Sequence, residues 1–220
     1  MKTSITLLFI VIISGCAARP PLPEAINSNS LEAGNSLVVG SLSRRNGMRS
    51  FSSWSIYFRD INGTTSKKIG GKADPAALFN RYDFDFSEKT YSGNLFAFLV
   101  PAGEYEIFNA EMGLNQGTTY KHWRSERDFS IKFQAQPGEI TYIGEYAVEP
   151  LSHKSFFFGL PVTSSGVWLI DDKSTRDIEL LKAKYPNLDW NSFNKSIPTE
   201  VNTPIFVLKS RINKGNSSNF

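Results

Sequence analysis

Short segments in which apolar and polar side chains alternate recur along the middle of the chain. One covers residues 54–58 (WSIYF), a second covers residues 82–86 (YDFDF) and a third covers residues 129–133 (FSIKF). Side chains of a β-strand point alternately to its two faces, so this alternation places one set in a core and the other in water. A chain built from such segments is expected to fold into β-sheets that each bury one face.

Further apolar runs and turn sequences extend this pattern. Three turn sequences, Asn62-Gly63, Pro101-Ala102-Gly103 and Gln136-Pro137-Gly138, are each expected to join two strands. Residues 153–165 are expected to form a longer loop. Many short strands with polar turns predict a mainly β fold, an antiparallel β-sandwich formed by a single domain over residues 36–209. The additional strands are expected at residues 37–42, 95–100, 104–110, 140–148, 167–170 and 205–208.

The C-terminal part of this domain contains one helical pattern, over residues 174–185. Asp171 and Asp172 precede it and mark the turn into the helix, and Ser174 is the candidate cap. Asp177 lies in the first turn, where the helix dipole favours a negative charge. The apolar positions fall on one stripe, formed by Ile178, Leu181 and Tyr185. We expect this helix to pack at the side or edge of the sandwich.

The N-terminus has a different character. An apolar run over residues 5–13 follows Lys2 and is interrupted only by Thr6. This run is too short to span a membrane and is typical of the apolar region of a secretory signal peptide. It ends in Ile13-Ser14-Gly15-Cys16, and Cys16 is the single cysteine of the chain. One cysteine excludes an internal disulfide framework and a zinc cluster of several thiolates.

The tetrapeptide at residues 13–16 resembles the lipobox of bacterial lipoproteins, an aliphatic residue followed by two small residues and cysteine. The resemblance implies a signal peptide at residues 1–15 and covalent lipid, including palmitate, on Cys16. Ala17, in place of aspartate, implies delivery to the outer membrane, with the protein on the periplasmic face or at the cell surface. Residues 16–35, rich in Pro, Ser and Asn, are expected to be a flexible lipid-anchored tether, and residues 210–220 a disordered tail.

Two segments of the body carry a second resemblance. Residues 100–107 (VPAGEYEI) resemble the Pro-Ala-Gly-x-Tyr hairpin of transthyretin-like and carboxypeptidase-regulatory-like domains. Residues 137–145 (PGEITYIGE) resemble a second hairpin of small bacterial lipoproteins with that architecture. The resemblance covers about residues 36–150 and implies a β-sandwich without catalytic residues, because such domains usually carry none.

The residues that could carry chemistry do not form a familiar catalytic or metal-binding pattern. His122 and His153 lack metal-ligand spacing. Asp83 and Asp85 could bind a cation from one strand face, or they could belong to a solvated polar face. A net charge of +3 over 220 residues excludes a nucleic-acid footprint. We therefore expect no catalytic residue, no metal and no cofactor beyond the lipid on Cys16.

The best candidate binding surface is the segment that contains Tyr120, His122, Trp123 and Arg124, which we expect in a loop. Exposed aromatic side chains stack on sugars or on partner side chains, although Trp123 could instead belong to the core or its rim. The expected function is a non-enzymatic outer-membrane lipoprotein that acts as an interaction module for an envelope protein. Two alternatives are a carbohydrate- or peptidoglycan-binding module that uses Tyr120 and Trp123, and an envelope hydrolase whose site is not visible in the sequence.

Overall fold

A computed structural model describes residues 26, 31, 34–47, 50–72, 83–115, 118–154, 161–191 and 193–209. The predicted signal peptide (1–15), the lipidation site Cys16 and the predicted tail (210–220) lie outside these residues. The strands and the helix α2 follow one another along the chain as β1 (Asn35–Arg45), β2 (Ser53–Asp60), β3 (Ser66–Lys72), β4 (Phe86–Ser87), β5 (Tyr91–Pro101), β6 (Gly103–Asn115), β7 (Tyr120–Arg124), β8 (Ile131–Ala135), β9 (Ile140–Lys154), β10 (Pro161–Asp171), α2 (Ser174–Lys184), β11 (Phe193–Lys195) and β12 (Phe206–Leu208). The mainly β fold with a C-terminal helix is confirmed.

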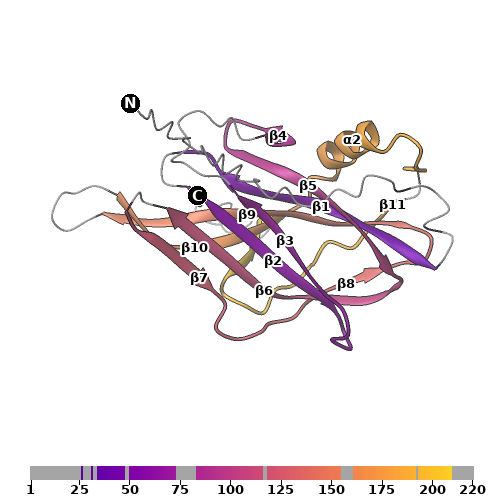
Figure 1. Cartoon of the computed structure of the whole chain (residues 1–220), viewed down its shortest axis with the longest axis horizontal. Coiled ribbons are helices and arrows are strands. Elements are labelled where there is room, and N and C mark those ends of the chain that lie inside the picture. The colour runs from indigo at the N-terminus through magenta and orange to yellow at the C-terminus, as the bar shows by residue number, and fades with distance from the viewer. Residues whose placement is uncertain are drawn as a thin grey trace, which may run out of the picture.

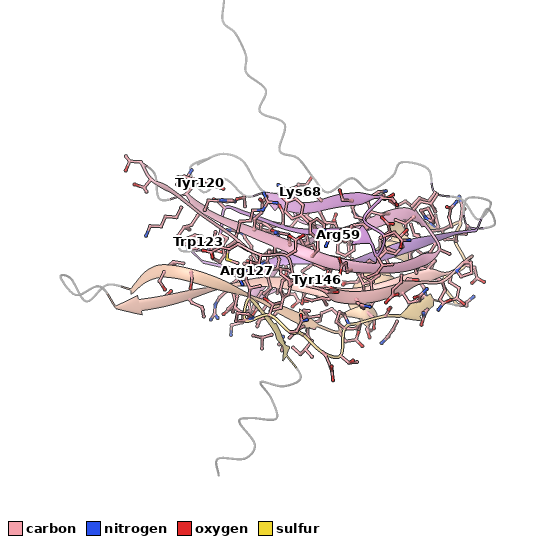
Figure 2. All side chains as sticks on the ribbon, turned by 90° about the horizontal axis from the view of Figure 1, so that it is seen from below. Arg59, Lys68, Tyr120, Trp123, Arg127 and Tyr146 are labelled. Atoms are coloured by element: carbon pink, nitrogen blue, oxygen red, sulfur yellow. The ribbon has the colours of Figure 1, made fainter. Side chains whose placement is uncertain are left out.

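The strands form two sheets that lie in layers (Figures 1 and 2). Sheet A has the order β12-β10-β9-β1-β5-β4, with β11 paired to β9. Sheet B has the order β3-β2-β6-β7, with β8 paired to β6. The pairs of sheet B are all antiparallel, as predicted. Sheet A is mixed, because β1, β10 and β9 each have a parallel neighbour.

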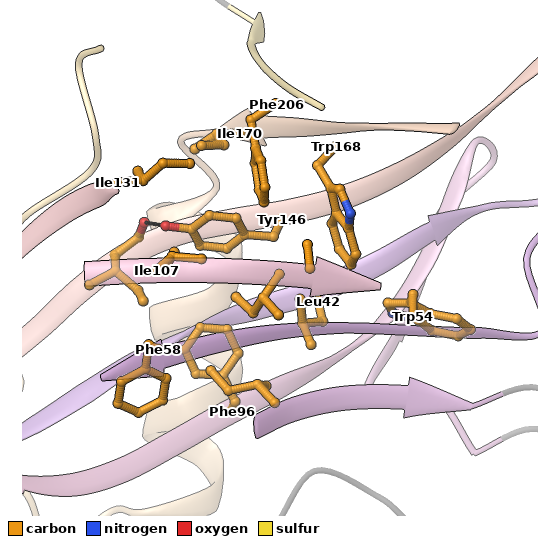
Figure 3. Close-up of a cluster of buried hydrophobic side chains, with 14 of the residues drawn as sticks. Leu42, Trp54, Phe58, Phe96, Ile107, Ile131, Tyr146, Trp168, Ile170 and Phe206 are labelled. Carbon is orange, nitrogen blue, oxygen red and sulfur yellow. Dashed lines mark hydrogen bonds between the residues drawn. The ribbon is translucent and has the colours of Figure 1, made fainter. Parts of the chain in front are cut away.

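The main core lies between the two sheets (Figure 3). The alternating series of β2 contributes Trp54, Ile56 and Phe58, which are buried as predicted. Trp168 of β10 stacks on Phe206 of β12, with ring centroids 5.9 Å apart. These contacts join the C-terminal strand to the core, so the last described residues belong to the sandwich.

A second apolar cluster covers the other face of sheet A. The stripe of α2 packs there against side chains of β1, β5 and β9, so the helix covers a sheet face. Ile26 and Leu31, two residues of the predicted tether, are buried in the same cluster and therefore belong to the folded part. Sheet A is thus buried on both faces, which explains why residues 37–39 are apolar at consecutive positions.

Two of the predicted turns join the sheets. Residues 101–103 connect β5 of sheet A to β6 of sheet B, and residues 136–138 connect β8 of sheet B to β9 of sheet A. The hairpins suggested by the sequence at these two points are therefore links between layers. The Asn62-Gly63 turn does form a hairpin, between β2 and β3, with Gly63 at φ 71°.

Three local predictions are corrected by the structure. The loop expected over residues 153–165 is shorter, because β9 continues to Lys154 and β10 begins at Pro161. Of the strand expected over residues 82–86, residues 83–85 are not in a strand and Phe86 begins the short strand β4, while residue 82 lies outside the described residues. Ser174 does not cap the helix with its side chain; instead, the preceding Asp172 accepts a hydrogen bond from the Ser174 backbone N–H through Oδ1, at 2.9 Å.

A β-bulge in β9 determines which side chains reach the helix. The register between β1 and β9 shifts between Val39 and Ser41, and Gly144 of β9 has φ +111°. Before the bulge Tyr142 faces the helical layer, and after it Tyr146 faces the main core. Because the bulge reverses the alternation, Glu145 lies on the helical side of sheet A, where it contacts α2.

Candidate binding face on sheet B

The predicted binding segment forms the edge strand β7, not a loop. Strand geometry therefore separates its side chains between two faces. Tyr120, His122 and Arg124 lie on the outer face of sheet B and are exposed. Trp123 is half-buried and packs against Phe51, with ring centroids 5.8 Å apart and ring planes at 84°. A surface that uses Tyr120 and Trp123 together cannot form, because the two rings point to opposite sides of the strand (Figure 2).

Tyr120 is held flat across the sheet. Its hydroxyl hydrogen-bonds Ser53 Oγ of β2 at 2.8 Å, although β6 lies between the two strands. A Cβ atom at Gly113 of β6 would overlap the Tyr120 hydroxyl, so only glycine lets the ring cross at this point. His122 stacks beside Tyr120, with centroids 6.4 Å apart and planes at 17°. Tyr120 keeps 57% of its surface exposed, so one side of an ordered aromatic pair remains open to solvent.

Two further rings lie on the same face, each under a cationic group. The Tyr57 ring has Lys68 Nζ at 5.2 Å and Arg124 Cζ at 5.3 Å from its centroid. The Phe108 ring has Arg59 Cζ at 4.3 Å. Contacts of this kind are worth about 0.5–1 kcal/mol each at exposed sites.

A β-bulge turns Phe108 outward. In β6, Asn109 pairs with Tyr57 while Ile107 pairs with Phe58, so Phe108 is the extra residue. The sequence pattern did not predict Tyr57 and Phe108 as members of this face. The sequence does indicate this bulge, because the apolar positions of β6 are two residues apart up to Ile107 and then three residues apart between Ile107 and Ala110.

The charges of this face are paired. Arg59 Nε lies 2.8 Å from Glu106 Oε1, and Arg59 Nη1 lies 3.0 Å from Asp128 Oδ2. Glu111 pairs with Lys68, and His122 Nε2 lies 3.5 Å from Glu111 Oε2. Each acid of the group therefore has a basic neighbour.

Electrostatics keep Glu111 ionised within this pairing. Burial opposes its ionisation, but hydrogen bonds from Lys68 and Tyr57 outweigh that effect and hold the pKa of Glu111 below its usual range. Arg124 also lies on this face and donates from Nε to the buried Asn109 Oδ1 at 3.2 Å, and Lys132 pairs with Glu104 at 3.1 Å. The face therefore offers fixed donors and acceptors with little net charge.

A second polar cluster lies beneath α2, on the opposite side of the sandwich. Asp177 is fully buried, and its Oδ2 accepts from Ser41 Oγ at 2.6 Å and from Tyr142 OH at 2.9 Å. Arg176 lies 2.7 Å from Asp177 Oδ1 and 3.1 Å from Glu145 Oε1, both through Nη2.

This cluster places two buried carboxylates around one guanidinium. Burial raises the pKa values of Asp177 and Glu145, although Arg176 opposes the rise in both. The Arg176 guanidinium also lies over the Phe86 ring, 3.5 Å from its centroid. These contacts join α2 to β1 and β9. Asp177, the acid at the centre of the cluster, is not accessible to solvent. We therefore assign the cluster to attachment of the helix.

The other residues that the sequence suggested for metal binding do not form a metal site among the described residues. Asp85 Oδ2 accepts from the backbone N–H of Leu95 at 2.8 Å, and its Oδ1 pairs with Lys184 of α2, so it is neither a free cation ligand nor a merely solvated charge. His153 lies in β9, and its side chain is outside the described set. In the ranges that the structure describes, no three His, Cys, Asp or Glu side chains gather as a metal site.

Comparisons with known proteins assign no family. No family model and no curated protein matches the chain. Among solved structures, the chain is similar to a leucine-rich repeat protein from Bacteroides thetaiotaomicron, with 14% identity and a TM-score of 0.30. The match covers 77% of this chain but 18% of that protein. None of the helices within the described residues has the length and apolar character to cross a membrane.

Proposed function

We propose that the chain is a non-enzymatic, lipid-anchored interaction module of the bacterial outer membrane, and that it binds its partner through the outer face of sheet B. The observation that carries this proposal is the ordered aromatic and ion-paired surface around Tyr120, Tyr57 and Glu111. The lipobox-like residues 13–16 support the anchor. The Pro-Ala-Gly segment at residues 101–103 supports a likeness to transthyretin-like lipoprotein domains in sequence.

The position of Ile26 supports a defined orientation of this module. Ile26 packs on the helical side of sheet A, and it lies ten Cα–Cα steps along the chain from Cys16. Ten residues span at most about 36 Å when fully extended. The tether to an anchor on Cys16 would therefore leave the folded part on the helical side of sheet A, which favours an orientation with that side toward the membrane and sheet B toward the periplasm or the cell exterior.

Site-specific photo-crosslinking in cells tests the binding face. A crosslinking amino acid at His122, on the outer face of sheet B, is expected to give one dominant product with an envelope component. The same amino acid at Glu179, an exposed position on α2, is the matched control and should not give that product. Equal products from both positions, or none from His122, would contradict the proposed face.

Metabolic labelling tests the anchor separately. Labelled palmitate is expected to enter the wild-type chain and to be absent from Cys16→Ser, because a hydroxyl does not replace the thiol in thioether formation. The measurement is radioactivity in the immunoprecipitated protein, with total protein amount as the control. Equal labelling of the two chains would show that Cys16 is not the site of lipid attachment.

A further inference from the structure

We infer that the outer face of sheet B binds an uncharged polysaccharide chain, with one sugar ring stacked on the Tyr120–His122 pair. This inference rests on the proposed function, because it names the partner of the same face. The two rings lie nearly parallel, and a hydrogen bond to Ser53 fixes the Tyr120 hydroxyl. A pyranose ring presents C–H groups on its faces and hydroxyls around its edge. An ordered, open aromatic surface suits such a face, and it loses little side-chain entropy on binding.

The polar groups next to this pair match sugar hydroxyls. Glu111, an acceptor, lies between Lys68 and His122, and Arg124 lies opposite it on β7. A hydroxyl both donates and accepts, so one sugar can bond to the acid and to a neighbouring base at the same time. The edge of a stacked sugar would find the acid Glu111 on the adjoining strand β6 and the base Arg124 on β7 itself.

The charge balance argues against a polyanion or a charged peptide. The bases Arg59, Lys68 and Arg124 share the face with the acids Glu106, Glu111 and Asp128. A polyanion such as nucleic acid requires an excess of basic groups, because phosphate contacts supply most of its affinity. Paired charges attract neither an acidic nor a basic polymer, whereas they hydrogen-bond a neutral one.

The distribution of apolar side chains argues against a protein partner. Protein interfaces have an apolar centre and cover about 800 Å² on each partner. Among the described residues, the large hydrophobic side chains that are exposed are Ile61, Tyr120 and Leu151. They lie on the β2–β3 turn, on β7 and on β9, so they do not form one patch. On the outer face of sheet B, Tyr57 and Phe108 are half-buried under cations, so the open aromatic surface is the Tyr120–His122 pair. An open surface of this small size in a polar surrounding fits a sugar better than a protein.

Binding of defined oligosaccharides tests the inference. The probes are cellohexaose and chitohexaose as neutral chains, and hexagalacturonate as a charged one, added to the full-length chain in a detergent without a sugar headgroup. Isothermal titration is expected to detect saturable binding of a neutral chain. Tyr120→Ala should weaken this binding roughly tenfold, because it removes the stacking surface. Tyr120→Phe should weaken it less than threefold, since the ring remains.

Lys121→Ala is the matched control, because Lys121 lies on the same strand but points to the other face. It should leave binding unchanged, and circular dichroism should show that all variants are folded. The inference is overturned if neither neutral chain binds at millimolar concentration, if hexagalacturonate binds more tightly, or if Tyr120→Ala binds like the wild type. If one of these results accompanies a specific protein crosslink from His122, the proposed binding face stands and its partner is a protein. If the His122 crosslink is also absent, both proposals fail.

Discussion

Replacing Arg176 with alanine is expected to destabilise the fold by about 3–5 kcal/mol at neutral pH, because it leaves buried carboxylates without their cation. Asp177 and Glu145 expose 0% and 2% of their surface, and Arg176 is the basic group that contacts both. Urea unfolding followed by tryptophan fluorescence measures the loss. Arg127→Ala is the matched control, because it removes an exposed arginine, and it should cost less than about 0.5 kcal/mol.

The loss of unfolding free energy in Arg176→Ala should increase as the pH rises. Burial already raises the pKa values of Asp177 and Glu145 in the folded chain, and removal of Arg176 raises them further. An acid with a raised folded pKa supports folding fully below its unfolded pKa of about 4, and this support is lost as pH rises through the folded pKa. The variant should therefore approach the wild type near pH 4 and fall furthest behind at pH 8.

A second substitution separates buried charge from lost packing. Glu145→Gln added to Arg176→Ala removes one of the two unpaired charges while it keeps the side-chain size, so it should recover part of the stability at pH 8. The same substitution should recover little at pH 4, where the acid is already protonated. A deficit that is constant from pH 4 to pH 8 and unaffected by Glu145→Gln would mean that Arg176 acts through its packing on Phe86.

Much of this fold follows from local chemistry that the sequence displays. The alternation in residues 54–58 predicted β2 and its buried face, and the stripe on residues 174–185 predicted α2 to within one residue. Period-two and helical patterns are readable because each depends on a few neighbouring residues. Whether two strands share a sheet depends on contacts far along the chain. The links at residues 101–103 and 136–138 therefore read as hairpins although they join the two layers.

The binding face was predicted in part for the same reason. The sequence indicated Tyr120, His122 and Arg124, because exposed aromatic and basic residues cluster there. It could not show that Trp123 points away, because that depends on β7 pairing with β6 as an edge strand. The alternation in residues 54–58 predicted Tyr57 only as an outward position of a strand. Its role on this face follows from the register that brings Lys68 and Arg124 over its ring.

Gly40→Ala is expected to cost about 3 kcal/mol, although it adds only one methyl group. In β1 the added Cβ would lie 2.5 Å from the Gly144 carbonyl oxygen of β9 and 2.6 Å from Phe96 Cζ of β5. Atoms of both neighbouring strands therefore occupy the space that the added methyl group would need. Overpacking of this kind in a tight core costs about 1–3 kcal/mol. The backbone contact belongs to the bulge and cannot move aside like a flexible side chain, which places the cost at the upper end. Denaturant unfolding measures it.

The matched control is Gly103→Ala, where the nearest atom to the added Cβ is Tyr105 Cε2 at 3.9 Å. That distance is an ordinary contact, so this variant should stay within about 0.5 kcal/mol of the wild type. The two substitutions are chemically identical, and both lie at strand positions without positive φ. A difference between them therefore reports the space at each site and not the loss of glycine itself. Equal costs would show that the backbone at Gly144 can move enough to accept the added methyl group, and would contradict the close packing inferred at Gly40.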